Sequence, residues 1–331
     1  MVRPTVIVLS LASLVLIVFV QLRGGSDGPL VRTRLLMGTV VEIRVHDEDA
    51  DRFDPAVTEA FDAMAAIEQR MSPHVPDSEL NRISAATEPI AISHETQKVL
   101  KIALEVMSAS GGAFDPGLGR LVQLWGFAEG EPGLPDEEAI RSALRGTGPG
   151  DLQLVDGEVF KLDPALAVDL GGVAKGYAID RAVAVLTAAG VRHAAVNAGG
   201  DIRLIGDRGG APWRIGIQHP RQSEIVLARL NLADRAVVTS GDYERSFERN
   251  GVRYHHILDP VTGYPARQCQ AVTVVAADAA RADALATAIF VLGPEQGMAL
   301  LETTAGVEGL IVAADGTIAT TAGLKEMIAW R

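Results

Sequence analysis

The sequence predicts an α+β domain, and two observations support this class. Apolar residues recur at helical spacing in three well separated segments, 55–71, 93–110 and 279–292. Short alternating or apolar segments typical of strands dominate the last third, without a regular alternation of strand and helix. At 331 residues and 48% hydrophobic content, the chain is long enough to bury a large core in such a domain.

Each predicted element follows from a local pattern. The segment 39–45 alternates apolar and polar residues like a strand, and 55–71 has the apolar stripe of an amphipathic helix. The helix at 93–110 begins after the N-cap Ser93 and ends at a Gly-Gly pair. By the same criteria we expect a loop at 126–133, helices at 135–144, 173–186 and 279–292, and strands at 166–170, 194–197, 213–218, 225–230, 236–240, 254–258, 271–276, 310–313 and 318–321.

The N-terminus differs in composition from this domain. Residues 6–22 are almost all apolar, which is close to the 17–25 or so residues that a transmembrane helix needs. No convincing small-x-small cleavage site follows, so we expect 1–23 to be a signal anchor rather than a cleaved signal peptide. A Gly-rich flexible tether is expected at 24–33, and the folded domain at 34–331. We expect the domain on the extracytoplasmic, periplasmic side of the cytoplasmic (inner) membrane.

Charge and cysteine content exclude several classes. The net charge of −12 argues against nucleic acid as a partner, because phosphate backbones are bound through an excess of Lys and Arg. The single cysteine, Cys269, excludes an intrachain disulfide framework and a multi-cysteine metal site. In its apolar strand context it is expected to be a small buried hydrophobe.

The segment 168–177 is a candidate anion site. It is predicted to be a short strand, a double-glycine turn and the start of a helix, where backbone N–H groups can face an anion. Lys175 opposes the helix dipole there, so it either faces a bound anion or pairs with nearby Asp169. Tyr177 stands where a P-loop needs Ser or Thr, and Val173 where the dinucleotide fingerprint needs its second glycine. The segment therefore belongs to neither motif.

The helix at 279–292 contains an unusual carboxylate. Asp283 and Thr287 share a helix face whose other residues are small and apolar. A carboxylate in such surroundings should be paired or metal-bound, since an isolated buried charge is costly. The two side chains offer only oxygen ligands, which suits Mg²⁺. The alternative is a capping or surface aspartate.

Two adjacent histidines lie in the predicted strand at 254–258. Strand alternation points His255 and His256 to opposite faces, which makes them poor ligands for one zinc ion. A histidine near a strand end is a candidate general base toward a hydroxyl, and its alternative is a structural role. Polar segments at 111–117 and 197–201 are either connections or close approaches to a ligand.

Taken together, these segments resemble the ApbE family of FAD:protein FMN transferases. The similarity runs in the family's order over nearly all of residues 34–331. Its motifs are Met37-Gly-Thr39, Met71-Ser72 with 77–80, Gly112-Ala-Phe-Asp115 with 124–127, Val168 to Tyr177, Asn197-Ala-Gly-Gly-Asp201, Thr239-Ser-Gly-Asp-Tyr243, His256-Ile-Leu-Asp-Pro260 with Thr262-Gly263, and Ala282 to Thr287.

The resemblance implies a domain related to the T-fold that binds FAD and Mg²⁺. It also implies transfer of the FMN part of FAD to a Ser or Thr hydroxyl of a partner protein, with AMP leaving. His256 would be the catalytic histidine. The FAD contacts would be Met37, His74, Ala113, Phe114, Asp115, Asp169, Lys175 and Leu258, and the metal site would comprise the Gly172 carbonyl, Asp283, Ala286 and Thr287.

The sequence departs from the family's pattern at two points, and two other functions remain as alternatives. His74 stands where members often carry Tyr or Trp, and the lipoprotein cysteine of many exported members is absent. The nearest alternative function is a FAD pyrophosphatase that yields FMN and AMP. A non-catalytic flavin-binding protein is the alternative of a different class.

Overall fold

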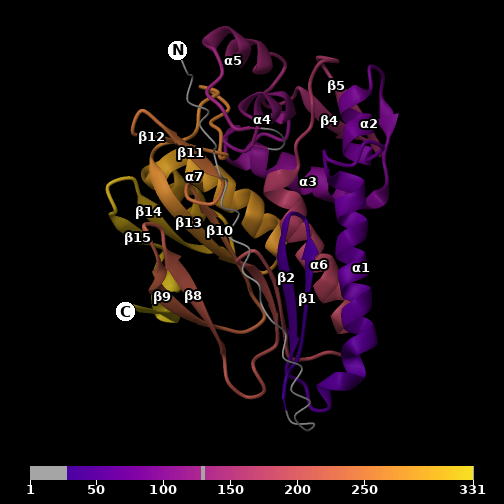
Figure 1. The fold of residues 1–331 in the computed structure, drawn as a ribbon, viewed down its shortest axis with the longest axis vertical. Helices are drawn as coiled ribbons and strands as arrows, with labels where there is room; N and C mark the ends of the chain where they lie inside the picture. Colours follow the sequence, from indigo (N-terminus) through magenta and orange to yellow (C-terminus); the bar gives the residue numbers. More distant parts are fainter. Residues whose placement is uncertain (1–27, 128–130, 331) are drawn as a thin grey trace, which may run out of the picture.

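The structure is a computed structural model that describes residues 28–127 and 131–330, and its architecture is α+β (Figure 1). The main sheet has eight strands in the order β1-β2-β6-β7-β10-β13-β14-β15, and every neighbouring pair is antiparallel. Its strands are β1 (Leu30–Leu36), β2 (Thr39–Val45), β6 (Ala194–Ala198), β7 (Asp201–Ile205), β10 (Ala236–Gly241), β13 (Cys269–Ala276), β14 (Glu308–Ala313) and β15 (Ile318–Thr320). The predicted α+β class is confirmed.

Four long helices build the main core against this sheet. They are α1 (Asp54–Met71), α3 (His94–Ala109), α6 (Gly171–Ala188) and α7 (Ala279–Thr303). Helix α6 packs between α1 and α7, and α7 packs on β10, β13 and β14. Fully buried side chains such as Phe61, Ile179 and Phe290 fill the layer, so burial of apolar surface stabilises this arrangement.

A small second sheet packs on the main sheet and forms a second apolar core with it. It contains β8 (Trp213–His219), β9 (Gln222–Leu232) and β16 (Ile328–Trp330), with α8 (Ala322–Met327) beside it. Leu204, Leu230 and Val275 belong to its buried apolar cluster. Alternation along β9 gives one buried face toward this cluster, as a half-covered antiparallel sheet requires.

A third cluster is aromatic and joins α4 (Gly119–Trp125), α5 (Glu137–Ala143), β11 (Ser246–Arg249) and β12 (Val252–His255). Trp125 is fully buried, and its Nε1–H donates to the Gly263 carbonyl at 2.9 Å. Its ring lies 5.7 Å from that of Tyr254. The hydrogen bond from Trp125 to Gly263 joins two motifs that are far apart in the sequence and holds the turn that follows β12.

The remaining elements are the 3₁₀ helix Ala50–Phe53, α2 (Glu79–Ala85), β3 (Ile90–Ala91), β4 (Leu152–Val155) and β5 (Glu158–Lys161).

The motif at 77–80 has a structural explanation. The buried carboxylate of Glu79 accepts hydrogen bonds from the Ser93 N–H at 2.8 Å and the Ser93 hydroxyl at 2.6 Å, and also from the Thr96 hydroxyl. These bonds tie the start of α2 to the N-terminus of α3. They also hold the pKa of Glu79 below its usual value although burial opposes them.

Several expected boundaries are wrong. Helix α6 begins at Gly171, so the two glycines expected in a turn open the helix. Residues 166–170 form no strand, because the Asp169 N–H donates to the Pro116 carbonyl and the Val168 N–H to the Ser84 hydroxyl. The expected strand at 254–258 ends at His255. Residues 30–33, placed in the tether, belong to β1, where they pair with β2. The proposed anchor at 1–23 lies outside the described residues.

Helix α7 runs further than expected and changes direction at Gly293. That residue has φ 81°, in the left-handed region that glycine tolerates, and a second helical part continues from Pro294. Among the residues described here, α7 is long and apolar enough to cross a membrane, with a mean hydropathy of 1.4 in its most apolar stretch. Half of that stretch is buried inside the domain, as in a core helix of a soluble fold.

Candidate active site

A deep cavity of about 780 Å³ lies where segments from the whole chain converge. Its walls come from the β1–β2 hairpin tip, the end of α1, the loop after α3 and the start of α6, and from the β6–β7 turn, the end of β10, the segment after β12 and α7. Such a volume is typical of a binding site for a ligand of cofactor size.

The cavity brings together nearly all the site residues expected from the sequence. Ala286 is the exception: it is fully buried in α7 and does not line the cavity. The predicted residues in the wall are Met37, His74, Ala113, Phe114, Asp115, Asp169, Gly172, Lys175, His256, Leu258, Asp283 and Thr287.

The hairpin tip presents Met37 in a constrained backbone conformation. Met37 and Gly38 have φ of 53° and 70°, so the two-residue turn has positive φ at both positions. The Met37 N–H donates to the Glu68 carboxylate of α1 at 2.8 Å. This bond fixes the turn against the end of α1 and directs it to the cavity.

Lys175 is paired with a residue that sequence reasoning did not assign to the site. Its Nζ lies 2.6 Å from Oδ2 of Asp201, at the start of β7, so the alternative in which Lys175 pairs with Asp169 is wrong. Burial lowers the pKa of Lys175, but the carboxylates of Asp201 and Asp283 outweigh it and raise the pKa above its usual range. The Asp169 carboxylate instead accepts from the Gly171 N–H at 2.9 Å, at the first residue of α6.

Asp283 is a buried carboxylate in the cavity wall, and the surface or capping alternative is wrong. It is 5% exposed, and its Oδ2 accepts from the Gly176 N–H of α6 at 3.0 Å. The N-cap of α7 is Asp278. Burial first, and then the nearby charge of Asp201, raise the pKa of Asp283 to about 7.

Gly172, Asp283 and Thr287 line the cavity together and offer only oxygen ligands, the kind that a hard cation prefers. A Cβ built at Gly172 would lie 3.3 Å from the Thr287 hydroxyl, so α6 and α7 approach closely here. Within the described part of the chain, no group of three His, Cys, Asp or Glu side chains could hold a metal. A cation at this place would need a carboxylate supplemented by hydroxyl and carbonyl oxygens, which suits Mg²⁺ better than Zn²⁺.

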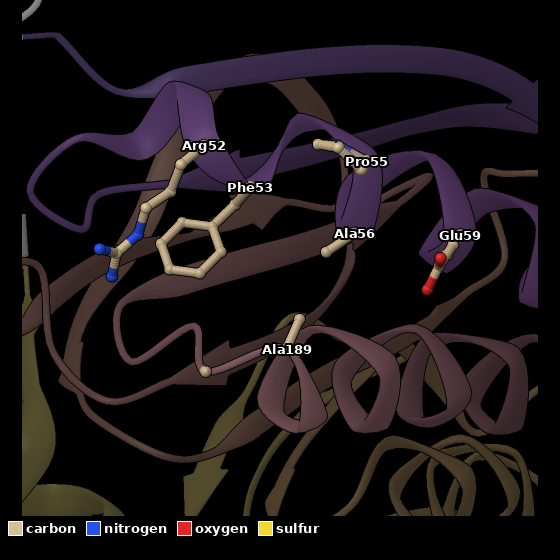
Figure 2. A pocket seen from close by; sticks show the side chains of 7 residues that line it. Arg52, Phe53, Pro55, Ala56, Glu59 and Ala189 are labelled. Atoms are coloured by element: carbon tan, nitrogen blue, oxygen red, sulfur yellow. The ribbon is translucent and has the colours of Figure 1, made fainter.

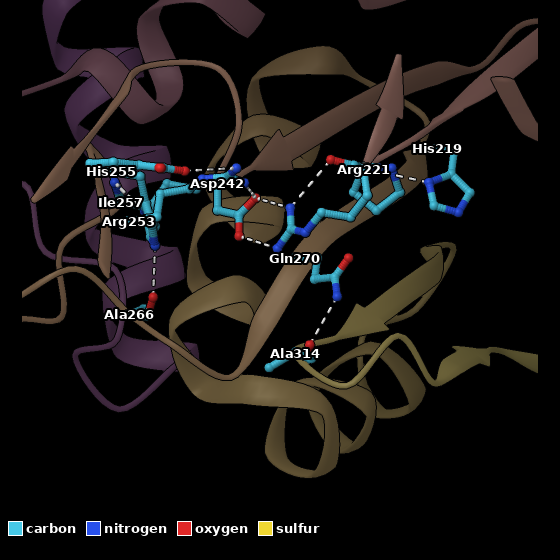
Figure 3. Close-up of polar contacts among 11 residues, drawn as sticks. His219, Arg221, Asp242, Arg253, His255, Ile257, Ala266, Gln270 and Ala314 are labelled. Atoms are coloured by element: carbon cyan, nitrogen blue, oxygen red, sulfur yellow. Dashed lines mark hydrogen bonds and ion pairs between the residues drawn. The ribbon is translucent and has the colours of Figure 1, made fainter. Parts of the chain in front are cut away.

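The end of β12 directs His256 into the cavity. The buried His255 ring lies within 2.8 Å of the Ala266 carbonyl through Nε2 and accepts from the Ile257 N–H through Nδ1 at 3.3 Å (Figure 3). These bonds hold the chain where it leaves the strand. The next residue, His256, lines the cavity and donates its backbone N–H to the Arg245 carbonyl at 3.1 Å.

In the described structure, the His256 side chain is a neutral imidazole with an unsatisfied ring nitrogen. Its Nδ1 is buried and has no hydrogen-bond partner among the described residues. Burial, followed by the charge of Arg245, lowers the pKa of His256 to about 3. The ring is therefore neutral at neutral pH, which is the form that a general base requires before it takes a proton.

Asp115 offers a second unused acceptor. Its Oδ1 accepts from the Gly117 N–H at 2.7 Å, whereas the buried Oδ2 makes no hydrogen bond of good geometry in the described structure, although the nearby Gly148 N–H also favours the charged carboxylate. Burial raises the pKa of this carboxyl. Buried polar atoms are almost always satisfied in folded proteins, so Oδ2 fits an N–H or O–H donor of a ligand.

Several cavity residues were missed by the sequence analysis. Asp201 and Tyr243 end motifs that were quoted for their resemblance without a role for either residue, and Glu244 and Arg245 directly follow Tyr243. The 242–245 turn is held by a bidentate ion pair in which both Arg221 nitrogens lie 2.7 Å from the Asp242 carboxylate (Figure 3). Local sequence patterns do not reveal this pair, because Arg221 comes from the β8–β9 turn.

A smaller pocket lies apart from this site. It has a volume of about 460 Å³ and is formed between the start of α1 and the end of α6 by Arg52, Phe53, Ala56 and Ala189, among others (Figure 2). It contains none of the predicted site residues, and its rim is open. We therefore take the large cavity as the functional site.

The fold and this cavity define an α+β protein whose binding site combines a buried carboxylate, a paired lysine and a neutral histidine. The chain matches the model of the ApbE family over residues 37–311. It belongs to that family.

Relatives and solved structures agree with this assignment. The chain is 35% identical over 318 residues to a FAD:protein FMN transferase of Treponema pallidum, covering 90% of this chain and 88% of that protein. It is 36% identical to a FAD:protein FMN transferase of Vibrio cholerae, covering 88% and 89%. The structure of the ApbE protein of Thermotoga maritima matches with a TM-score of 0.83 at 37% identity, covering 90% of this chain and 99% of the other. The flavin transferase ApbE of Vibrio cholerae matches with a TM-score of 0.80 at 32% identity, with the same coverage.

Proposed function

We propose that this protein is a Mg²⁺-dependent FAD:protein FMN transferase. It moves the FMN part of FAD to a Ser or Thr hydroxyl of a partner protein and releases AMP. The name shared by its relatives supports the activity. The observation that carries the proposal is the convergence of Lys175, His256 and Asp283 on one cavity large enough for a dinucleotide.

FAD would occupy the cavity in contact with side chains from five segments. Met37, Phe114 and Leu258 offer apolar surface to the flavin or adenine ring, and His74 adds a polar aromatic ring. The unpaired Oδ2 of Asp115 would accept a hydrogen bond from a ring or ribose donor. Ala113 and Asp169 complete the proposed contacts.

Mg²⁺ would be held by the carboxylate of Asp283, the hydroxyl of Thr287 and the carbonyl of Gly172, with Ala286 adjacent on α7. When bound, it would neutralise charge on the pyrophosphate. Lys175 would supply a further positive charge nearby, held in place by Asp201.

His256 would act as the general base. Its neutral imidazole takes the proton of the acceptor hydroxyl as that oxygen attacks the phosphorus of the FMN phosphate. A new phosphoester bond forms, and the bond from phosphorus to the AMP oxygen breaks, so AMP leaves. We expect His256→Ala to keep FAD binding and lose most transfer; a rate near wild type would contradict this role.

One experiment separates the candidate reactions. The protein is incubated with FAD, Mg²⁺ and a candidate acceptor, and the acceptor is read by intact mass together with free nucleotides. A mass increase of the acceptor with release of AMP supports transfer. Free FMN and AMP with an unchanged acceptor support FAD hydrolysis, and unchanged FAD supports binding alone.

We also propose that residues 1–23 anchor the domain on the periplasmic side of the cytoplasmic membrane. The support is the apolar composition of residues 6–22, which lie outside the described structure. Fractionation of cells that produce the full chain tests it. Recovery of the protein in the washed membrane, with the domain open to protease added outside the cytoplasm, is the expected result.

A further inference from the structure

The charges around the cavity do not obviously favour an anion. Carboxylates of several segments line it, among them Asp169, Asp201, Glu244 and Asp283, whereas the lining cations are Lys175 and Arg245. The pyrophosphate of FAD is itself negatively charged. A cavity that binds it needs a positive charge that is not already neutralised.

Beside the proposed Mg²⁺, Lys175 is already paired with a carboxylate, whereas Arg245 forms no ion pair with the described residues, although its charge also acts on Asp169 and Glu244. The ammonium of Lys175 is 2.6 Å from the Asp201 carboxylate. Arg245 makes no ion pair or side-chain hydrogen bond within the described part of the chain. Its charge still reaches the cavity, since it lowers the pKa of both His256 and Asp169.

The backbone of Arg245 is fixed although its side chain is not. Three residues earlier, Asp242 is clamped by Arg221, and the Asp242 N–H donates to the Gln270 carbonyl at 3.1 Å. The Arg245 carbonyl accepts from the N–H of His256 at 3.1 Å. The guanidinium therefore starts from a rigid position beside the proposed base and has its donors free.

We infer that Arg245 is a catalytic residue that binds the phosphate of FAD beside His256, an inference that rests on the proposed function. A guanidinium offers paired N–H donors that match two phosphate oxygens and stays charged at all working pH values. It would remain on the phosphate while the bond to AMP breaks and negative charge develops on the leaving oxygen.

This arrangement couples FAD binding to the base. In the free protein, Arg245, His255 and Lys175 all oppose a proton on His256, in addition to burial. A phosphate paired with Arg245 offsets the charge that has the largest effect among these three. His256 then becomes a stronger base when the substrate is in place.

The test compares FAD with riboflavin, which carries the same ring system without phosphates. Binding of both to the full chain is followed by flavin fluorescence in Arg245→Gln, Arg245→Lys and wild type. We expect Arg245→Gln to weaken FAD binding roughly tenfold or more, as loss of a charged hydrogen-bonding group implies, and to leave riboflavin binding unchanged. Arg245→Lys should lie between wild type and Arg245→Gln.

The matched control is Arg249→Gln. Arg249 is an exposed arginine on β11 that does not line the cavity, so its loss should change neither ligand. The melting temperatures of all variants should stay close to that of wild type, because the Arg245 side chain makes no hydrogen bond or ion pair in the described structure. Single-turnover transfer by Arg245→Gln at saturating FAD should also be slower than wild type.

Several outcomes would overturn the inference. Equal losses of FAD and riboflavin affinity in Arg245→Gln would show that Arg245 has a structural role. Unchanged FAD affinity and an unchanged transfer rate would show that Arg245 does not contact the phosphate. The result also separates this inference from the proposed function. A protein that modifies no acceptor but loses FAD selectively in Arg245→Gln contradicts transfer while keeping the phosphate contact. If the protein transfers FMN and Arg245→Gln changes neither FAD affinity nor transfer rate, only the proposed contact between Arg245 and the phosphate is contradicted.

Discussion

Lys175 and Asp201 form a buried ion pair, with 2.6 Å between Nζ and Oδ2, that joins α6 to the start of β7 across the cavity wall. The Asp201 side chain is 3% exposed, and its Oδ1 also accepts from the Thr239 N–H of β10 at 3.2 Å. One carboxylate therefore links three elements of the site. Its charge explains how a lysine can be kept ionised in a largely buried position.

The pair leads to a prediction about stability. Lys175→Met leaves the Asp201 carboxylate buried and unpaired beside Asp283, and we expect a loss of about 3–5 kcal/mol in the free energy of unfolding. Urea unfolding of Lys175→Met, Asp201→Asn and the double variant measures it. The double variant should be more stable than Lys175→Met, since the uncompensated charge is gone. A double variant no more stable than the single lysine variant would argue against the pair.

A second prediction concerns the proposed metal site. Asp283→Ala should abolish the increase of transfer rate with Mg²⁺, because it removes the buried carboxylate of that site. Mg²⁺ titration of the transfer rate measures this. Asp278→Ala is the control on the same helix: it removes the N-cap of α7 and should cost about 1 kcal/mol of stability without changing the Mg²⁺ response. An undiminished response in Asp283→Ala would remove Asp283 from the site.

A third prediction tests the contact between α6 and α7. A Cβ at Gly176 would lie 2.3 Å from the Ala279 carbonyl oxygen, and backbone cannot move aside cheaply. Gly176→Ala should therefore destabilise the domain by roughly 1–3 kcal/mol or more, despite alanine's higher helix propensity. At Gly171, the nearest atom is a side-chain oxygen of Asp169 at 3.1 Å, so Gly171→Ala should cost less. Equal thermal stabilities of the two variants would refute the close approach.

A fourth prediction concerns pH. The pKa of His256 is lowered to about 3 in the folded protein, below its ordinary value of 6.5. Between these values the unfolded chain binds more protons at this residue, so stability falls as pH decreases through the window, by up to about 1.4 kcal/mol per unit. Well above pH 6.5, His256 is neutral in both the folded and the unfolded chain, so none of this stability is lost.

Comparison of wild type with His256→Gln isolates this effect from other titrating groups. Urea unfolding at about pH 7.5 and about pH 5 should show a smaller loss of stability in the variant. His255, whose pKa burial also lowers, remains in both proteins and contributes equally. Identical losses in the two proteins would mean that His256 is not buried in its neutral form.

Local patterns determined much of the fold. The helices at 55–71 and 93–110 and the strand at 39–45 were expected within two residues of their observed limits, because apolar periodicity and capping residues act within one element. Where backbone N–H groups bond to partners distant in the sequence, the apolar pattern predicted the wrong element. Residues 166–170 are apolar like a strand, yet their N–H groups bond to a loop carbonyl and a serine side chain.

The sequence by itself determined the residue types of the site through their resemblance to one family, together with the α+β class. Only the tertiary structure decided which of them meet: Lys175 with Asp201 instead of Asp169, Asp283 against the backbone of Gly176, and Arg245 beside His256. The physical reason is that pairing energies depend on distance and burial in space. Neither quantity is encoded in the spacing of residues along a chain.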